Sequence, residues 1–295
     1  MVRRFLWLLF IALLPAAVLV YLSRPETLSP DQLPDHSLSA ERGELLVHAG
    51  GCYSCHGSGL EGGLEMESPF GSFRVPNITP DPRTGIGAWS TLEFVNAMRG
   101  VAPDGQHYYP AFPYPSYRRM RLTDLMDLKA YLDTVTAVSN DVPDQDLRFP
   151  WNLRRGLGFW KRLYLADGPV VAIDPQSTAA ARGRYLVEGA GHCGACHTPR
   201  NRLGGLKLSR WVAGGPHPDG KGSVPNITPH PDGLAGWSQG EIVYYLETGF
   251  TPDFDTVGGS MVKVQEHLSR LPRENLEAIA AYLKAVPPVA SASAE

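Results

Sequence analysis

The chain contains Cys52-Tyr53-Ser54-Cys55-His56 and, 141 residues further on, Cys193-Gly194-Ala195-Cys196-His197. Both pentapeptides read Cys-x-x-Cys-His, and together they hold all four cysteines of the 295-residue chain. Other short sequences recur around them in the same order, such as Val-Pro-Asn-Ile-Thr-Pro at residues 75–80 and again at 224–229. The offset drifts to 151 at the Ala-Tyr-Leu of residues 130–132 and 281–283. This pattern predicts a duplicated domain, and we place the copies at residues 38–138 and 177–288.

The two pentapeptides are typical of covalent haem attachment. On one helical turn both cysteines face the same way, so the two thiols can form thioethers with the vinyl groups of one haem. The histidine that follows can then reach the iron. We therefore expect two covalently attached haem c groups, with these anchors and iron ligands: Cys52, Cys55 and His56; Cys193, Cys196 and His197.

Three further uses of the cysteines compete with this interpretation. Four cysteines can bind one zinc ion, form disulfides in any of three pairings, or act as a redox dithiol. A zinc site or a disulfide leaves the histidine after each pair unexplained, and a dithiol would need a βαβ context that the sequence does not show. Haem attachment accounts for both histidines, and we favour it.

An electron-transfer haem commonly has a methionine sulfur opposite the histidine. Met261 is the only methionine of the second copy and ends the glycine-rich stretch Gly258-Gly259-Ser260-Met261. The matching position of the first copy is Phe112, which cannot ligate iron. For the first haem we predict Met120, in preference to His107, Met98 and Met66. The alternative is a five-coordinate first haem that faces Phe112 and is open to small ligands.

Apolar residues at helical spacing mark a helix at the start and end of each copy, and no strand pattern persists between them. The sequence therefore predicts an all-α fold. Gly43 and Gly183 lie inside the opening helices, where glycine costs about 1 kcal/mol relative to alanine. A bulky residue lying across each glycine would compensate, and we expect Tyr131 and Tyr282 of the closing helices to do so.

Arg3 and Arg4 precede an uncharged run over residues 5–22. At about 1.5 Å per residue, this run approaches the roughly 30 Å of a hydrocarbon core. Basic residues stay on the cytoplasmic side, so we expect residues 1–25 to form a signal-anchor helix in the inner membrane with the haem domains in the periplasm. The alternative is a cleaved signal peptide, but the small-x-small site of such peptides is missing.

Residues 139–176 form a linker whose segment 148–164 mixes aromatic and basic side chains. Either this segment lies on a bilayer or a partner, or it packs between the domains with its arginines over haem propionates. Residues 289–295 form a tail that we expect to be disordered. The net charge of −3 argues against nucleic-acid binding, which depends on clustered basic residues.

With these motifs in place, the exported part of the chain resembles the c-type cytochrome subunits of bacterial membrane-bound alcohol, aldehyde and gluconate dehydrogenases, and related di-haem cytochromes c. The resemblance rests on both Cys-x-x-Cys-His motifs, both Pro-Asn-Ile-Thr-Pro segments with Trp89 and Trp237, and Tyr-Pro-Ala-Phe-Pro-Tyr at 109–114. It implies two tandem class I cytochrome c-like domains with long haem-wrapping loops. It also implies that Asn77 and Asn226 lie near the haem propionates, while a plain turn role explains them equally well.

The chain departs from that family in two respects. Phe112 stands where the best-known members have methionine, although some di-haem relatives combine phenylalanine there with a methionine just before the helix, as at Met120. The chain also has two haem modules where those subunits usually have three. These departures bear on which dehydrogenase is the partner, not on electron transfer.

The resemblance implies a membrane-anchored relay. Single electrons would come from a periplasmic or membrane-bound dehydrogenase and pass to a cytochrome, a quinone-linked complex or an oxidase. The alternative is a di-haem redox enzyme, such as a peroxidase or a thiosulfate dehydrogenase, that uses an open first haem with His107 as the nearby acid–base group. A third possibility is a subunit whose main role is to dock a soluble dehydrogenase at the membrane.

Overall fold

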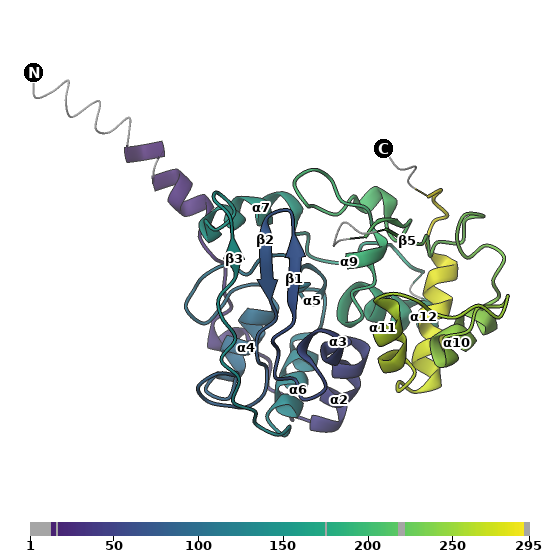
Figure 1. Ribbon diagram of the computed structural model, residues 1–295, viewed down its shortest axis with the longest axis horizontal. Coiled ribbons are helices and arrows are strands. Elements are labelled where there is room, and N and C mark those ends of the chain that lie inside the picture. Colours follow the sequence, from purple (N-terminus) through teal and green to yellow (C-terminus); the bar gives the residue numbers. More distant parts are fainter. Residues whose placement is uncertain (1–12, 16, 175, 218–221, 292–295) are drawn as a thin grey trace, which may run out of the picture.

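The computed structural model describes the chain except for residues 1–12, 16, 175, 218–221 and 292–295. Two mainly helical domains lie side by side, and the described part of an N-terminal helix projects from the first (Figure 1). In the first domain, α2 (Ala40–Ala49) packs against α6 (Leu122–Leu132). In the second, α8 (Thr178–Tyr185) packs against α12 (Arg273–Ala285). The helices predicted at the start and end of each copy are therefore confirmed.

Glycine stands at the point where each pair of helices crosses. A Cβ atom at Gly43 would clash with the Asp127 carbonyl and lie 2.7 Å from the Cβ of Tyr131. The second domain repeats this geometry, with Gly183 at the same 2.7 Å from the Cβ of Tyr282. Because no side chain fits at either position, the helices approach more closely than any other residue would allow. The predicted partners Tyr131 and Tyr282 are confirmed.

Between the crossing glycine and the first cysteine, the second domain holds one more residue than the first. Gly183 follows Gly43 by 140 residues, whereas Cys193 follows Cys52 by 141. The structure absorbs the extra residue in η3 (Leu186–Ala190), a π-helical turn that directly follows α8. A π-turn accommodates one extra residue in a helix, and here the chain kinks at Gly189, whose φ and ψ are −101° and −105°. The attachment motif of the second domain therefore keeps its position after the insertion.

The repeated Trp-Ser dipeptide marks the start of a middle helix in each domain. Ser90 caps α4 (Thr91–Met98) and Ser238 caps α10 (Gln239–Thr248). In both helices a glutamate three residues after the serine completes a capping box. Such a box satisfies backbone N–H groups that have no partner within the helix. The duplicated dipeptide thus has a structural role in each domain, as the start signal of a helix.

The structure corrects the prediction of an all-α fold, because short strands lie between the helices. β1 (Glu65–Ser68) and β2 (Gly71–Arg74) form an antiparallel hairpin, and β3 (Asp146–Leu147) extends it to a three-stranded sheet. In the second domain, β4 (Gly215–Pro216) pairs with β5 (Ser223–Val224). These strands are too short for a period-2 pattern to stand out. β3 also comes from the linker, far from its partners in sequence.

Shorter helices fill the remaining segments. The attachment motifs form α3 (Cys52–His56) and α9 (Gly194–His197). Two helices precede the closing helices of the domains, α5 (Tyr114–Tyr117) and α11 (Met261–Leu268). The others are the 3-10 turns η1 (Pro30–Gln32), η2 (Arg154–Gly156) and η4 (Leu208–Arg210), and the linker helix α7 (Leu157–Tyr164).

The linker helix α7 contacts both domains. The indole of Trp160 donates to the Leu203 carbonyl of the second domain at 2.8 Å, and the Lys161 ammonium donates to the Gly100 carbonyl of the first at 2.5 Å. Arg155 and Arg162 instead bind the chain at residues 20–23. Of the two expectations for this segment, the described contacts fit packing between the domains.

Half of the apolar run over residues 5–22, predicted as a membrane anchor, lies outside the described residues. Its described part, 13–15 and 17–22, is helical and mostly exposed. Within the described ranges, no helix has the length and apolar character needed to cross a bilayer.

The start of the C-terminal tail is ordered, which corrects the prediction of disorder from residue 289. The Val289 carbonyl accepts a hydrogen bond from the Asn226 amide at 2.7 Å, and the Ala290 carbonyl accepts one from Arg210 at 2.7 Å. These contacts tie residues 289 and 290 to loops of the second domain. Composition alone predicts disorder here because long-range hydrogen bonds leave no local pattern.

Candidate haem attachment sites

The first attachment motif forms one short helix whose histidine is fixed by the neighbouring loop. Nδ1 of His56 lies 2.8 Å from the carbonyl oxygen of Pro76. A carbonyl oxygen only accepts, so Nδ1 carries the proton and the lone pair remains on Nε2. This is the tautomer that an iron ligand needs, with its other nitrogen donating to a backbone carbonyl. Pro76 begins the first Pro-Asn-Ile-Thr-Pro segment.

The second motif repeats this arrangement. Nδ1 of His197 donates to the Pro225 carbonyl, again at 2.8 Å, and Pro225 begins the second Pro-Asn-Ile-Thr-Pro segment. This role of the prolines was not predicted from the sequence. A signal for it was present, because each proline follows the histidine of its own copy, by 20 residues in the first and 28 in the second. Because Cys-x-x-Cys-His precedes Pro-Asn-Ile-Thr-Pro in both copies, the two motifs are expected to form the same contact in each copy.

Asn77 and Asn226 hold these loops in shape. The side-chain oxygen of Asn77 accepts from the backbone N–H of Thr79 at 2.9 Å, and its amide donates to the Val138 carbonyl at 2.7 Å. Asn226 accepts from the Thr228 N–H at 2.8 Å and donates its amide to the Val289 carbonyl. Both asparagines are buried. The observed contacts fit the turn role, and contact with haem propionates stays a prediction.

The protonation states at both sites suit covalent haem. Burial lowers the pKa of His56 to about 4, and it also lowers the pKa of His197, so both imidazoles are neutral ligands at neutral pH. Burial, reinforced by the neighbouring cysteine, raises the pKa values of Cys52 and Cys193 to about 12. These sulfurs are therefore thiols and not the activated thiolates of a redox dithiol.

Disulfide and metal-binding roles of the cysteines have no geometric support. Cys52, Cys55 and Cys193 are not bridged, which excludes every disulfide pairing of the four in this structure. Among the described residues, no group of three or more histidines, cysteines and carboxylates could hold a metal ion. The two motifs instead form two separate sites. At each site, the thiols and the oriented, neutral histidine form a donor set that fits one haem.

Tyrosines of the closing helices brace both attachment helices. The hydroxyl groups of Tyr53 in α3 and Tyr131 in α6 are hydrogen-bonded at 3.0 Å. In the second domain, the ring of Trp211 fills the space beside Gly194 of α9, and its indole N–H donates to the Tyr282 hydroxyl at 3.0 Å. The tyrosine of the repeated Ala-Tyr-Leu thus has two roles in each domain. Its ring packs against the opening helix, and its hydroxyl forms a hydrogen bond near the cysteines.

The two predicted methionine ligands occupy different environments. Met261 is the first residue of α11, partly buried against the core, and not part of a free loop. Met120 lies between α5 and α6, is 5% exposed, and faces the second domain, where its Cγ lies 3.4 Å from a Cβ position at Gly189. Their coordination of iron stays a prediction.

The remaining candidates for the first iron lie as follows. His107 is buried and its Nε2 is 2.9 Å from the Ser23 carbonyl, so its ring is held at the N-terminal segment. Met98 is buried in α4, and Met66 belongs to β1. Phe112 packs against the rings of Tyr108 and Tyr117 at 5.5 Å each. None of these contacts involves the attachment motif directly.

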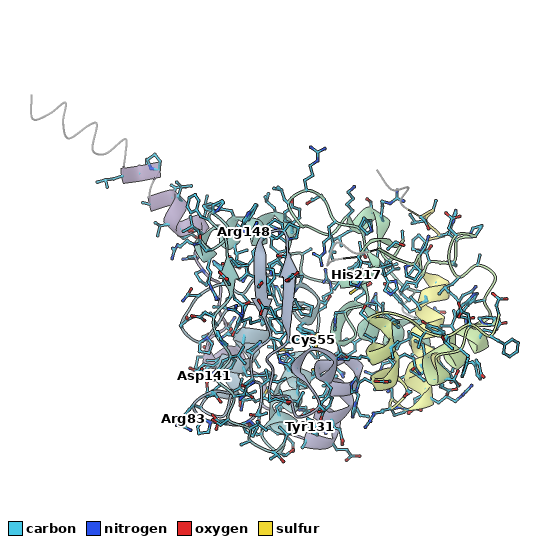
Figure 2. The ribbon with its side chains drawn as sticks, viewed as in Figure 1. Cys55, Arg83, Tyr131, Asp141, Arg148 and His217 are labelled. Atoms are coloured by element: carbon cyan, nitrogen blue, oxygen red, sulfur yellow. The ribbon has the colours of Figure 1, made fainter. Side chains whose placement is uncertain are left out.

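The two attachment regions meet at the domain interface. A Cβ atom at Gly50 would lie 3.3 Å from the Ala190 carbonyl oxygen and 3.6 Å from Sγ of Cys52. A Cβ atom at Gly191 would lie 3.5 Å from the Ala49 carbonyl oxygen and 3.5 Å from Sγ of Cys193. The ends of both opening helices therefore touch, each beside the first cysteine of its motif. Cys55 lies near this boundary (Figure 2).

Comparison with known proteins supports the same interpretation. The cytochrome c family model matches residues 40–136 and 180–287. A di-haem cytochrome c-type protein of Cereibacter sphaeroides is 47% identical, over 95% of this chain and 97% of that protein. A subunit of the nicotinate dehydrogenase of Pseudomonas putida is 42% identical, over 83% of this chain but 21% of the subunit.

The cytochrome subunit of the fructose dehydrogenase of Gluconobacter japonicus is 37% identical, over 90% of this chain and 56% of that subunit. The chain thus spans nearly all of one relative but only part of the two dehydrogenase subunits. Both family matches contain a Cys-x-x-Cys-His motif with a histidine oriented for iron. The chain belongs to the cytochrome c family, as a di-haem member that carries two covalently bound haem c groups.

Proposed function

We propose that this di-haem cytochrome c takes single electrons from a dehydrogenase and passes them to a respiratory acceptor, while its N-terminal segment holds it at the inner membrane. The haem groups supply a reversible one-electron change at iron. The chain supplies the axial histidines, their orientation and the packing that limits access of water. The acceptor is a cytochrome, a quinone-linked complex or an oxidase.

The contact between the two attachment regions carries this proposal. Glycines at Gly50 and Gly191 let the ends of the opening helices touch, with Cys52 and Cys193 directly beside them. A protein that used each site independently would not need this approach. Tyr117 of α5 extends the contact, because its ring meets His192 edge to face at 5.6 Å. The fold is therefore suited to passing electrons between its two halves.

Relatives support a dehydrogenase as the donor. The chain is 37% identical to the cytochrome c subunit of the gluconate 2-dehydrogenase of Pantoea cypripedii, of which it covers 62%. The fructose and nicotinate dehydrogenase subunits described above point the same way. These proteins act on different substrates, so the shared cytochrome part indicates the class of donor and not its substrate.

The N-terminal segment supports the membrane location. Two arginines followed by an apolar run over residues 5–22 are typical of a signal anchor. Arg155 and Arg162 of the linker and His107 of the first domain bind residues 20–23, which would place the first domain close to the bilayer surface. Extraction of native membranes with alkaline carbonate tests this part, since an anchored protein stays in the pellet and a released one contradicts the anchor.

The relay is tested with tagged full-length protein isolated from membranes together with its companion. We expect the substrate of that companion to reduce both haems. Variants that lack one attachment site, Cys52→Ala/Cys55→Ala or Cys193→Ala/Cys196→Ala, should still be recovered with the companion but lose at least tenfold in substrate-dependent oxygen consumption. Full consumption by either variant would show that electrons do not pass through both sites.

A further inference from the structure

A positively charged cavity lies at the junction of the N-terminal segment, α4, α5 and α7. Its volume is about 240 Å³. Since a water molecule occupies about 30 Å³ in the liquid, the cavity can hold a small polyatomic ion with several waters. The cations that line it come from four separate segments: Arg24, Arg99, Arg118, Lys161 and Arg162.

The carboxylates of the cavity do not balance these cations. Asp167 pairs with Arg118 at 3.0 Å, and Glu26 lies 3.7 Å from Arg162. Within the described part of the chain, no further acidic side chain lines the cavity. The Arg99 guanidinium makes no hydrogen bond or ion pair with any residue that the structure describes, although it is partly buried at the end of α4. Its donors are available to a ligand.

The pKa values of two of these cations reflect the excess of positive charge. Burial, with a contribution from Arg118, lowers the pKa of Lys161 to about 7, and the same two causes lower the pKa of Arg99. His107 is 3% exposed and its Nε2 donates to the Ser23 carbonyl, so Nδ1 carries the lone pair, and this acceptor has no hydrogen-bond partner among the described residues. Buried polar atoms are rarely left unpaired. An anion would relieve the repulsion between the cations, and an O–H group on such a ligand would give the Nδ1 lone pair a donor.

We propose that this cavity binds a phosphate-type oxyanion, held mainly by the guanidinium groups of Arg99 and Arg118 and the ammonium group of Lys161. Arginine forks suit the paired oxygens of a phosphate group, and lysine adds a point charge. Arg118 keeps Asp167 as a second partner and thereby remains oriented. The site is separate from both haem attachment motifs, since none of its lining residues belongs to either of them.

The position of the cavity favours the phosphate of a lipid headgroup over free phosphate. Arg24 and Glu26 follow directly on the apolar run, and Arg24 lies over the ring of Tyr21 at 4.2 Å. If residues 5–22 enter the bilayer, as proposed above, the cavity lies at the level of the headgroups. This assignment of the source rests on the proposed anchoring, whereas binding of an oxyanion does not.

Titration calorimetry on the full-length holoprotein in an uncharged detergent tests the site. The ligands are inorganic phosphate and a short-chain phosphatidylglycerol below its micellar concentration. We expect binding of at least one, and an Arg99→Gln or Lys161→Gln variant should weaken it about tenfold, as expected for one lost charge-assisted hydrogen bond. Tighter binding of the lipid identifies the headgroup as the source, and binding of phosphate alone identifies the free ion.

Arg148→Gln is the matched control. Arg148 lies on the same side of the first domain as the N-terminal helix but does not line the cavity, and Arg83 lies at the far end (Figure 2). Arg148→Gln removes the same charge as Arg99→Gln. Binding that arises from a general attraction to anions would therefore weaken equally in both variants. That result, or no binding of either ligand, would overturn the proposal. Unchanged haem spectra in Arg99→Gln would show that the haem sites are intact. A failed binding test would then not count against the proposed electron transfer.

Discussion

At the scale of single residues, Gly43 and Gly183 set the spacing of the helices that frame each haem site. A Cβ atom at Gly43 would clash with a backbone carbonyl of α6, which cannot move as a flexible side chain could. We expect Gly43→Ala to lower the free energy of unfolding by about 1–3 kcal/mol, the usual cost of overpacking. Thermal unfolding of the holoprotein measures the change.

Gly240→Ala is the control for this substitution. Gly240 lies in α10, is exposed, and has only the Ser238 hydroxyl within 4 Å of its Cβ position. Alanine there should raise the free energy of unfolding by up to about 1 kcal/mol, because helix propensity is the only change. Equal effects at the two positions would show that the crossing glycine is not required for packing.

Met261 and Met120 allow the iron ligands to be assigned one haem at a time. Loss of a methionine sulfur ligand should lower the reduction potential of one haem and convert that haem to a high-spin form that binds carbon monoxide. We expect Met261→Ala to do so for the second haem and Met120→Ala for the first. Visible spectra and redox titration of each variant give the result.

Met98→Ala separates coordination from packing. Met98 is as buried as Met120, at 7% against 5% exposed, so its truncation should cost similar stability, about 2–5 kcal/mol. Both haems should keep their spectra in that variant. If Met120→Ala also leaves both spectra unchanged, Met120 is a core residue and the first iron has another sixth ligand or none.

At the scale of elements, the π-turn η3 does more than absorb an inserted residue. It carries Glu188, whose buried carboxylate accepts from the Tyr282 hydroxyl at 2.6 Å and from the backbone N–H groups of Val170 and Val171 at 2.6 and 3.0 Å. The turn therefore joins the linker to α12 beside the second attachment site. In the first domain α2 runs through the corresponding positions as a regular α-helix, because the extra residue is missing there.

Glu188→Gln tests this junction. An amide NH₂ cannot accept the hydrogen bonds that one carboxylate oxygen receives, so buried donors would lose their partner. We expect the free energy of unfolding to fall by about 1–3 kcal/mol, and hydrogen exchange of the Val170 and Val171 amides to accelerate. Glu247→Gln, which alters a surface ion pair with Arg273, should cost less than about 1 kcal/mol. Unchanged exchange at Val170 would contradict the role of Glu188.

At the scale of the whole molecule, the duplication and both haem sites could be predicted because their signals are local and repeated. Cys-x-x-Cys-His is a complete chemical unit, and its recurrence with Pro-Asn-Ile-Thr-Pro predicted two equivalent modules. The role of Pro76 was missed because a backbone carbonyl has no sequence signature. The strand β3 and the order at Val289 were missed for a related reason, since both depend on partners far along the chain.

The domain interface also lay beyond prediction from sequence, and a stack of three rings illustrates it. His48 of α2 and His267 of α11 face each other with their Nδ1 atoms 3.3 Å apart, and Tyr53 stacks on both, with ring centroids 5.6 and 5.2 Å away. No repeat or spacing brings residues 48 and 267 together. The contact connects the first attachment helix to the second domain.

This stack should make the interface sensitive to acid. Burial lowers the pKa of both histidines, Arg270 lowers both further, and His267 lowers that of His48, whereas Glu44 and Glu266 act weakly in the opposite direction. A histidine whose folded pKa lies below its ordinary value of about 6.5 contributes full stability above that pH. The contribution is lost as the pH falls below 6.5 towards the lowered value in the folded protein.

We therefore expect the unfolding temperature of the holoprotein to fall between pH 7.5 and pH 5, and His267→Phe to reduce that fall. Phenylalanine keeps a ring in the stack but removes one of the two groups that would have to take up a proton. His230→Gln, which removes a histidine of the loop before α10, should leave the fall as large as in the parent protein. If the His267→Phe variant were as acid-sensitive as the parent protein, the groups that take up protons would lie elsewhere. The neutral phenyl ring cannot repel a protonated His48.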